Sequence, residues 1–209
     1  QAGDQIVVEE FLEGQEVSIL AFCDGQTVLL LDSAQDHKAA FDGDKGPNTG
    51  GMGAYSPAPI FSEIMRKKVR DKIMLPIIRA MKQEERVYKG ILYAGLMLTK
   101  SGPQILEFNA RFGDPETQPL LVRMESDIIP IFEACIDGTL DQCQLEWKKE
   151  SSVCVVMAAE GYPGSYKKGQ PISGLKDASA LPGIVVFHAG TKEKNRDVLT
   201  LSLIHISEP

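Results

Sequence analysis

The feature that most constrains this chain is a mixed polar and apolar stretch at 106–120, which reads L-E-F-N-A-R-F-G-D-P-E-T-Q-P-L. Successive side chains of a β-strand point to opposite faces, so Glu107 and Asn109 share one face while Leu106 and Phe108 share the other. One face can pack while the other offers a carboxylate and an amide oxygen, which suit Mg²⁺ held together with nucleotide phosphates. By itself, an E-x-N pair is more often an ordinary strand end.

The composition is that of a globular protein. The 209 residues are 43% hydrophobic and 24% charged, and the length suits one large domain or one and a half ordinary ones. A formal net charge of −7 argues against a nucleic-acid partner, because such proteins usually present a basic face. No apolar run reaches the ~18–20 residues of a membrane span, so we expect no membrane partner.

The cysteines indicate a reducing compartment. They form no C-x-x-C pair and have no zinc-type spacing with the histidines. We therefore expect free thiols in a cytoplasmic protein. The chain opens Q-A-G-D-Q, without a signal peptide or an initiator methionine, which suggests the interior of a longer polypeptide.

Hydrophobic periodicity predicts a mixed α and β protein. Strands are predicted at 6–12, 17–23, 28–31, 91–99, 104–109, 153–159, 171–175 and 183–188. The Asp24-Gly25 pair predicts a hairpin turn between the second and third of these strands. Residues 33–59 are rich in Gly, Pro, Asp and Asn, and their composition favours a long functional loop.

Two helical regions are predicted. The first runs over 62–86, with Ser62 as N-cap and a kink or break at Pro76. The second runs over 117–135 and is interrupted near Ser126-Asp127, which can cap a new helix that ends at Gly138. A polar stretch at 139–152 then predicts a boundary before a small, strand-rich region.

Two segments of the predicted loop offer groups for an anion. The chain has neither a P-loop nor a dinucleotide fingerprint. Residues 46–53 read G-P-N-T-G-G-M-G, and their glycines allow positive φ and expose backbone N–H groups. Taken alone, such a loop is more often a flexible surface turn, and Lys38 alone would more often be a solvated side chain.

Taken together, the motifs resemble those of one family. They are V-V-E-E-F-L-E-G-Q-E at 7–16, Q-D-H-K at 35–38, G-P-N-T-G-G-M-G-A-Y-S-P at 46–57, E-F-N-A-R-F-G-D-P-E-T-Q at 107–118, V-V-M-A-A-E-G-Y-P at 155–163 and F-H-A-G-T at 187–191. In this order the chain resembles the glycinamide ribonucleotide synthetases, ligases of purine biosynthesis with the ATP-grasp fold. The resemblance extends from about residue 5 to residue 192.

The resemblance implies an α+β fold in three parts. Residues 1–148 would be the C-terminal half of an ATP-grasp domain, an antiparallel sheet with helices. Residues 149–200 would be part of a small strand-rich C-terminal domain. Residues 201–209 match nothing in the family and resemble translated sequencing-adapter sequence, so we expect a non-native tail.

The resemblance also assigns the site. Glu107 and Asn109 would coordinate Mg²⁺ or Mn²⁺, while Lys38 and Arg111 would be catalytic, with Lys38 near the transferred phosphate. The residues expected to bind the nucleotide are Glu9, Glu10, Phe11, Leu12, Glu16 and Lys38. The residues expected to face the other substrates are Asn48, Thr49, Gly50, Gly51, Met52, Gly53, Arg111, Asp114 and Glu116.

The implied reaction is ligation of glycine to 5-phosphoribosylamine. ATP would phosphorylate the glycine carboxylate to an acyl phosphate, which the amine then attacks. Positioning and electrostatics should dominate such catalysis. We expect these small molecules as partners of a monomeric protein.

The chain departs from the family in two ways. Ala39 stands where arginine is usual, and a lost charged hydrogen bond could cost ~1–3 kcal/mol of binding. The resemblance also implies an N-terminal domain and a small lid that would precede Gln1, so we expect the sequence to be a fragment that is inactive alone. Another ATP-grasp carboxylate–amine ligase, and a non-catalytic nucleotide-binding module, stay open as alternatives.

Overall fold

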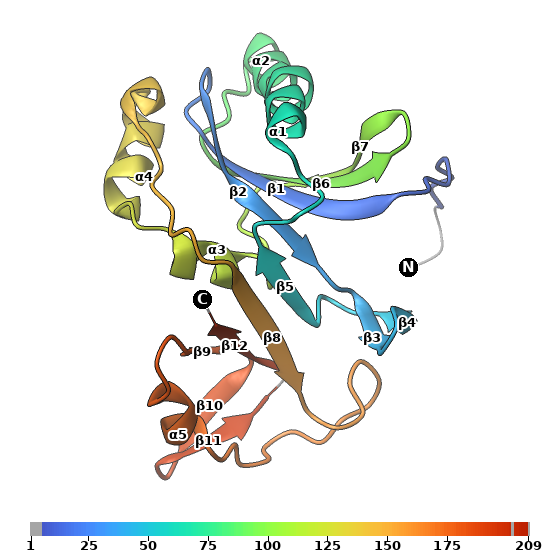
Figure 1. The fold of residues 1–209 in the computed structure, drawn as a ribbon, viewed down its shortest axis with the longest axis vertical. Coiled ribbons are helices and arrows are strands. Elements are labelled where there is room, and N and C mark those ends of the chain that lie inside the picture. The colour runs from blue at the N-terminus through green and yellow to red at the C-terminus, as the bar shows by residue number, and fades with distance from the viewer. Residues whose placement is uncertain (1–5, 202, 209) are drawn as a thin grey trace.

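A computed structural model describes residues 6–201 and 203–208. Its centre is an eight-stranded antiparallel sheet (Figure 1). The strands of this sheet are β1 (Gln15–Cys23), β2 (Val28–Asp36), β5 (Gly53–Ser56), β6 (Gly90–Thr99), β7 (Gly102–Asn109), β8 (Ser152–Ala158), β9 (Val185–His188) and β12 (Leu203–Glu208). Their order across the sheet is β7-β6-β1-β2-β5-β8-β12-β9.

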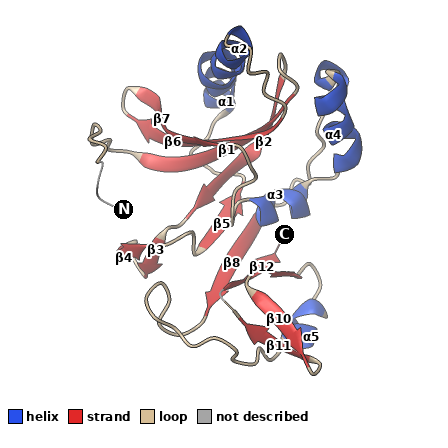
Figure 2. Ribbon diagram, turned by 180° about the vertical axis from the view of Figure 1, so that it is seen from behind, coloured by secondary structure: helices blue, strands red, loops and turns tan. Residues whose placement is uncertain are grey.

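Short ribbons and helices complete the fold. The ribbons pair β3 (Ala39–Phe41) with β4 (Lys45–Asn48), and β10 (Thr191–Lys194) with β11 (Asp197–Thr200). The helical segments are α1 (Glu63–Val69), the π-helical η1 (Arg70–Met74), α2 (Leu75–Gln83), α3 (Thr117–Arg123), α4 (Ile128–Asp137), the 3-10 helix η2 (Leu140–Gln142) and α5 (Leu175–Ser179). Figure 2 shows α1 and α2 together near β1 and β6, and α3 close to β8.

Strand β1 forms the centre of the core, because both of its faces are covered. Its alternate residues Val17 and Ile19 pack with apolar side chains of α1, η1 and α2. Leu20 and Phe22 point to the opposite face and pack with side chains of α3 and α4. This alternation follows from the strand geometry and divides the core into two layers, one on each side of the sheet.

The helix predicted over 62–86 forms, with an irregularity at its proline. Ser62 caps α1, since its Oγ accepts a hydrogen bond from the backbone N–H of Met65 at 3.3 Å. The π-helical η1 precedes Pro76, which lies in the first turn of α2. A wider turn there accommodates a residue that lacks an N–H and whose ring would clash with a preceding carbonyl.

The interruption of the second helical region is also confirmed. α3 ends at Arg123 and α4 begins at Ile128. The Asp127 side chain accepts from the N–H of Ile129 at 2.9 Å, and Gly138 ends α4 in the left-handed conformation. A carboxylate at the N-cap and a glycine past the C-terminus are the expected caps of such a helix.

Three predictions of secondary structure were wrong. Residues 6–12 are not a strand, although their composition favours one, because this segment lies beyond the paired residues of β1. Residues 33–59 are not one long loop: β2 continues to Asp36, and β3, β4 and β5 follow. Residues 171–175 form no strand, and α5 begins at Leu175.

The C-terminal region continues the main sheet. β8 pairs with β5, and β12 pairs with both β8 and β9. The boundary within 139–152 and the non-native origin of 201–209 stay predictions. Among the described residues, no helix combines the length and apolar character that a membrane crossing requires.

Candidate functional site

The pairing of β7 with β6 fixes the direction of the predicted metal ligands. Asn109 lies opposite Tyr93, and Glu107 lies opposite Gly95. Phe108 packs on the other face with the α1–α2 layer. A register shift after Gly95 marks a β-bulge just before Glu107. The two polar residues therefore share one face of the sheet, as the alternation predicted.

The absence of a side chain at Gly95 makes room for Glu107. A Cβ at Gly95 would lie 3.3 Å from Cγ of Glu107, which is tighter than ordinary packing. Gly95 also lies opposite Ser18 of β1. Glu107, Gly95 and Ser18 thus form one row across three strands, with the small residues beside the carboxylate.

The side chains of Glu107 and Asn109 form a donor set that fits a divalent cation shared with phosphates. A carboxylate and an amide oxygen from alternate residues are hard ligands, and Mg²⁺ commonly takes only one or two protein carboxylates beside water and phosphate oxygens. Within the described part of the chain, no three His, Cys, Asp or Glu residues gather as a metal-binding group. The metal role of Glu107 and Asn109 stays a prediction.

The glycine-rich segment is fastened to the segment that carries Lys38. The N–H of Thr49 donates to the Lys38 carbonyl at 2.7 Å, and the Thr49 hydroxyl donates to the same oxygen at 2.8 Å. The N–H of Met52 donates to the His37 carbonyl at 2.7 Å, and the N–H of His37 donates to the Gly53 carbonyl at 2.9 Å. These hydrogen bonds join residues 49–53 to His37 and Lys38, so residues 37–53 form one structural unit.

The same glycine-rich segment contacts the turn that follows β7. Gly51 has φ +126°, and a Cβ there would overlap the ring of Pro115. On its other side, Gly50 lies near the Tyr162 hydroxyl, which would be 3.9 Å from an added Cβ. The structure therefore brings together motifs that are far apart in the sequence.

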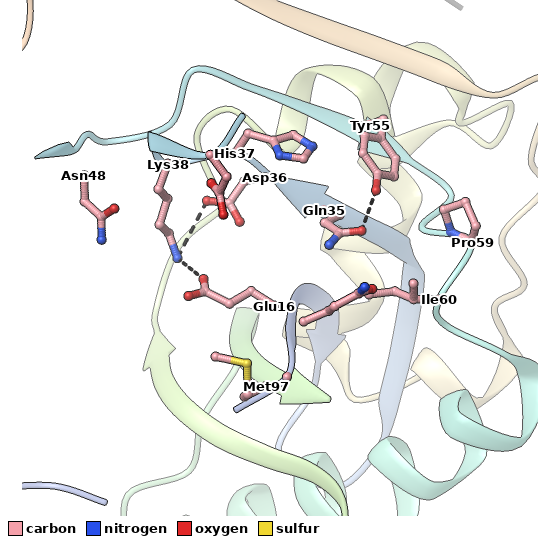
Figure 3. Close-up of a pocket in the computed structure, with 13 residues that line it drawn as sticks. Glu16, Gln35, Asp36, His37, Lys38, Asn48, Tyr55, Pro59, Ile60 and Met97 are labelled. Atoms are coloured by element: carbon pink, nitrogen blue, oxygen red, sulfur yellow. Dashed lines mark hydrogen bonds and ion pairs between the residues drawn. The ribbon is translucent and has the colours of Figure 1, made fainter. Parts of the chain in front are cut away.

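A cleft of about 560 Å³ opens beside this unit (Figure 3). Its lining residues are Gly14, Gln15, Glu16, Gln35, Asp36, His37, Lys38, Asp44, Asn48, Tyr55, Pro59, Ile60 and Met97. Lys38 lies between two carboxylates: its Nζ is 2.5 Å from Glu16 and 3.7 Å from Asp36. On the far side of the cleft, the Tyr55 hydroxyl donates to Gln35 at 2.5 Å.

Burial and charge alter the acidity of two groups in this cleft. Burial, then the negative charges of Glu116 and Glu16, raise the pKa of Asp36 to about 6, against the opposing effect of Lys38. Burial alone would lower the pKa of Lys38, but its hydrogen bond to Glu16 and the nearby carboxylates outweigh that effect and raise it. Lys38 therefore remains a cation.

Three residues, Ser18, Tyr93 and Glu116, form a buried hydrogen-bonded network that we call the Glu116 network. One oxygen of Glu116 accepts from both hydroxyls at 2.8 Å, and the hydroxyls are 2.9 Å apart. All three residues are buried. Burial and the charge of Glu116 raise the pKa of Tyr93, so the phenol stays protonated and can donate.

The other predicted site residues are less closely grouped. Arg111 is exposed and donates to the carbonyl of Phe112 at 2.8 Å, and the exposed Asp114 accepts from Gln118 at 3.1 Å. Glu116 was expected to face the substrates, but the residue is only 3% exposed.

The nucleotide-binding residues predicted at 9–12 lie outside the cleft, whose lining begins at Gly14. The segment is largely exposed, with Phe11 at 87%. Its role against the adenine stays a prediction. Ala39, in place of the usual arginine, opens β3 opposite Asn48, directly after Lys38.

Sequence reasoning missed several residues of this site. The sequence contains Asp36 and Tyr55 only as members of motifs, with no role assigned to either, and Ser18 and Tyr93 lie outside every motif. The signal for Asp36 was its position between Gln35 and the Lys38 segment in a conspicuously polar stretch. Ser18 and Tyr93 gave no local signal, because they lie 75 positions apart and their shared partner Glu116 lies 98 positions from Ser18 and 23 from Tyr93.

Comparison with known proteins matches two family models. "Phosphoribosylglycinamide synthetase, ATP-grasp (A) domain" matches residues 1–117, and the C domain of the same synthetase matches residues 152–202. The phosphoribosylamine–glycine ligases of Halalkalibacterium halodurans and Pseudomonas aeruginosa are 53% and 52% identical to the chain, over 95% of its length and 46% of theirs. The chain thus spans about half the length of the curated relatives it matches.

Solved structures agree on the fold. The crystal structure of the phosphoribosylamine–glycine ligase of Thermotoga maritima matches 95% of the chain and 49% of its own length, with 32% identity and a TM-score of 0.74. The biotin carboxylase domain of Hydrogenobacter thermophilus 2-oxoglutarate carboxylase, at 14% identity and a TM-score of 0.61, shows the shared fold alone. The architecture is the α+β fold of ATP-grasp proteins, and the chain belongs to the phosphoribosylglycinamide synthetase family.

Proposed function

We propose that this chain is the metal- and nucleotide-binding part of a phosphoribosylamine–glycine ligase. The complete protein would join glycine to 5-phosphoribosylamine at the expense of ATP, in purine biosynthesis. The observation that carries this proposal is the convergence of the Lys38 segment, the glycine-rich segment and the turn after β7 beside one polar sheet face. The proposed reaction is supported by the names of relatives that are 53% and 52% identical to the chain.

Each group has a proposed part in binding. Glu107 and Asn109 would hold Mg²⁺ or Mn²⁺, which supplies charge neutralisation between ATP phosphates and a carboxylate. Residues 9–12 and Glu16 would contact adenosine. Lys38 would approach the transferred phosphate, whose oxygens must then compete with Glu16 for its ammonium group.

The chemistry would proceed in two steps. The glycine carboxylate attacks the terminal phosphorus of ATP, giving glycyl phosphate and ADP. The amine of 5-phosphoribosylamine then attacks the acyl carbon, phosphate leaves, and the amine loses a proton. Arg111, Asp114 and the loop 48–53 would orient the two substrates, and the Lys38 cation would stabilise negative charge on the phosphoryl group.

We propose small molecules as the partners of a monomeric, cytoplasmic enzyme. Because the chain spans about half of its relatives, we expect the 209 residues alone not to turn over. The test therefore uses the chain extended to full length with the remaining part of the Halalkalibacterium halodurans ligase, which is 53% identical over 199 residues.

The extended protein should convert labelled glycine to glycinamide ribonucleotide. ADP should appear only when glycine and 5-phosphoribosylamine are both supplied, and each is omitted in turn as a control. ADP release with a different acid and amine would place the protein elsewhere among ATP-grasp ligases. ATP binding without turnover would favour the non-catalytic alternative.

A further inference from the structure

The Glu116 network lies directly beside the predicted metal ligands. Tyr93, which donates to Glu116, is the cross-strand neighbour of Asn109. Ser18, the second donor, lies opposite Gly95, and Gly95 lies opposite Glu107. The buried Glu116 carboxylate therefore accepts hydrogen bonds from β1 and from β6. Strand β6 in turn sets the register of β7, which carries Glu107 and Asn109.

The same carboxylate fixes the turn after β7. Glu116 follows Pro115, whose ring lies against Gly51 of the glycine-rich segment. Gly113 faces the Glu116 carboxylate so closely that a Cβ would overlap it. The Glu116 network therefore ties the 113–116 turn to strands β1 and β6 of the sheet.

Direct contact with a substrate does not fit this geometry. Glu116 is 3% exposed, and its Oε1 already accepts two hydrogen bonds. A buried carboxylate with two hydroxyl donors is a costly arrangement to break, because any unpaired partner left in the interior loses its solvation. Such a group acts through the elements that it joins.

We propose that Glu116 is a positioning residue that, through Tyr93 and Ser18, holds β6 and the 113–116 turn where Glu107 and Asn109 can bind a divalent cation together. The inference rests on the proposed function in one respect, which is that Glu107 and Asn109 bind the metal ion. It requires hydrogen-bond acceptance by Glu116 and no contact between Glu116 and any substrate.

The test compares two substitutions at this position in the extended protein. Mn²⁺ affinity is measured by electron paramagnetic resonance in the presence of ADP. Glu116→Ala removes the acceptor and should raise the Mn²⁺ dissociation constant about tenfold or more, as loss of a supporting residue around a metal typically does. Glu116→Gln keeps an oxygen that can accept from both hydroxyls, and should stay within about threefold of wild type.

A second buried carboxylate supplies the matched control. Asp24 is 4% exposed and accepts from the N–H groups of Gln26 at 2.9 Å and Thr27 at 2.6 Å, in the turn that follows β1. Asp24→Ala should lower stability without changing the Mn²⁺ dissociation constant. Tyr93→Phe removes one donor and gives a milder variant, should Glu116→Ala not fold.

The outcomes separate the two proposals. Unchanged Mn²⁺ affinity in Glu116→Ala would overturn the positioning role. If that variant does not fold, unchanged affinity in Tyr93→Phe would overturn it. An equal loss of Mn²⁺ affinity in Asp24→Ala would overturn it as well. Wild-type protein that binds Mn²⁺ with ADP but does not ligate glycine would overturn the proposed reaction alone. Wild-type protein that binds no Mn²⁺ with ADP would overturn both.

Discussion

Asp36 is a carboxyl whose ionisation should make stability depend on pH. Its side chain is 5% exposed, and burial and neighbouring carboxylates raise its pKa from 3.8 to about 6. The folded state therefore binds the proton more tightly than the unfolded state. The contribution to stability is full below about pH 4 and is lost as the pH rises through about 6.

Asp36→Asn should therefore stabilise the protein at pH 8, where the wild-type carboxylate is charged. The gain should be no more than about 3 kcal/mol, since one pKa unit corresponds to about 1.4 kcal/mol, and should vanish at pH 4. Urea unfolding of both proteins at the two pH values measures it. Net destabilisation at pH 8 would show instead that the Asp36–Lys38 pair outweighs the burial of the charge.

Arg123 is a structural cation, separate from the site. It is 4% exposed and donates to Asp32 and Ser56 at 2.8 Å and to the carbonyl of Glu150 at 2.7 Å. Arg123→Met should cost about 3–5 kcal/mol of unfolding free energy, because it leaves the buried Ser56 and the three-quarters-buried Asp32 carboxylate without this partner. Arg79→Met, at an exposed position of α2, should change the unfolding free energy by about 0.5 kcal/mol or less.

Equal effects of these two arginine substitutions in thermal or urea unfolding would contradict the assigned role of Arg123. The contrast also shows why the residue was not predicted. A charged residue at the end of a predicted helix is normally solvated, and Arg123 is buried because folding brings Asp32, Ser56 and the segment around Glu150 to it.

Among the secondary elements, the glycine-rich segment depends on its approach to Pro115. Gly51→Ala should be more destabilising than Gly90→Ala, although both positions have positive φ, +126° and +112°. An alanine Cβ at position 51 would overlap Pro115, whereas nothing lies within 4 Å at position 90. The substitution at 90 should cost about 1–2 kcal/mol of conformational strain, and that at 51 clearly more.

Chemical denaturation of the two alanine variants measures that difference directly. Similar losses of unfolding free energy in the two variants would mean that the glycine-rich segment can shift away from Pro115 at little cost in free energy. The ligation rate of the extended protein should also fall in Gly51→Ala but not in Gly90→Ala, because only the former displaces the glycine-rich segment from the 113–116 turn.

The elements that the sequence predicted well are those with local causes. The strands β6 and β7, the cap at Asp127 and the stop at Gly138 each follow from a few neighbouring residues. The strand predicted at 6–12 does not form, because β propensity alone does not provide a neighbouring strand with which the segment can pair. The short β5 was missed because it is a strand through its pairing with β2 and with β8, and β8 lies about a hundred residues away.

At the scale of the whole molecule, the site is an assembly of distant segments on one sheet. Alternation in β7 was enough to predict that Glu107 and Asn109 share a face, and the structure confirms this arrangement. The Glu116 network could not be predicted, because its three members come from β1, β6 and the turn after β7. Antiparallel pairing of those strands in the fold is what makes them neighbours.

The most direct measurement is calorimetric titration of Mn²⁺ with ADP into the extended protein and two matched variants. Glu107→Gln keeps the size of the side chain but removes its charge, and should weaken Mn²⁺ binding at least about tenfold. Glu193→Gln, at an exposed position of β10, should leave the affinity unchanged. Mn²⁺ binding that is equally strong in Glu107→Gln would contradict a metal site on this face of the sheet.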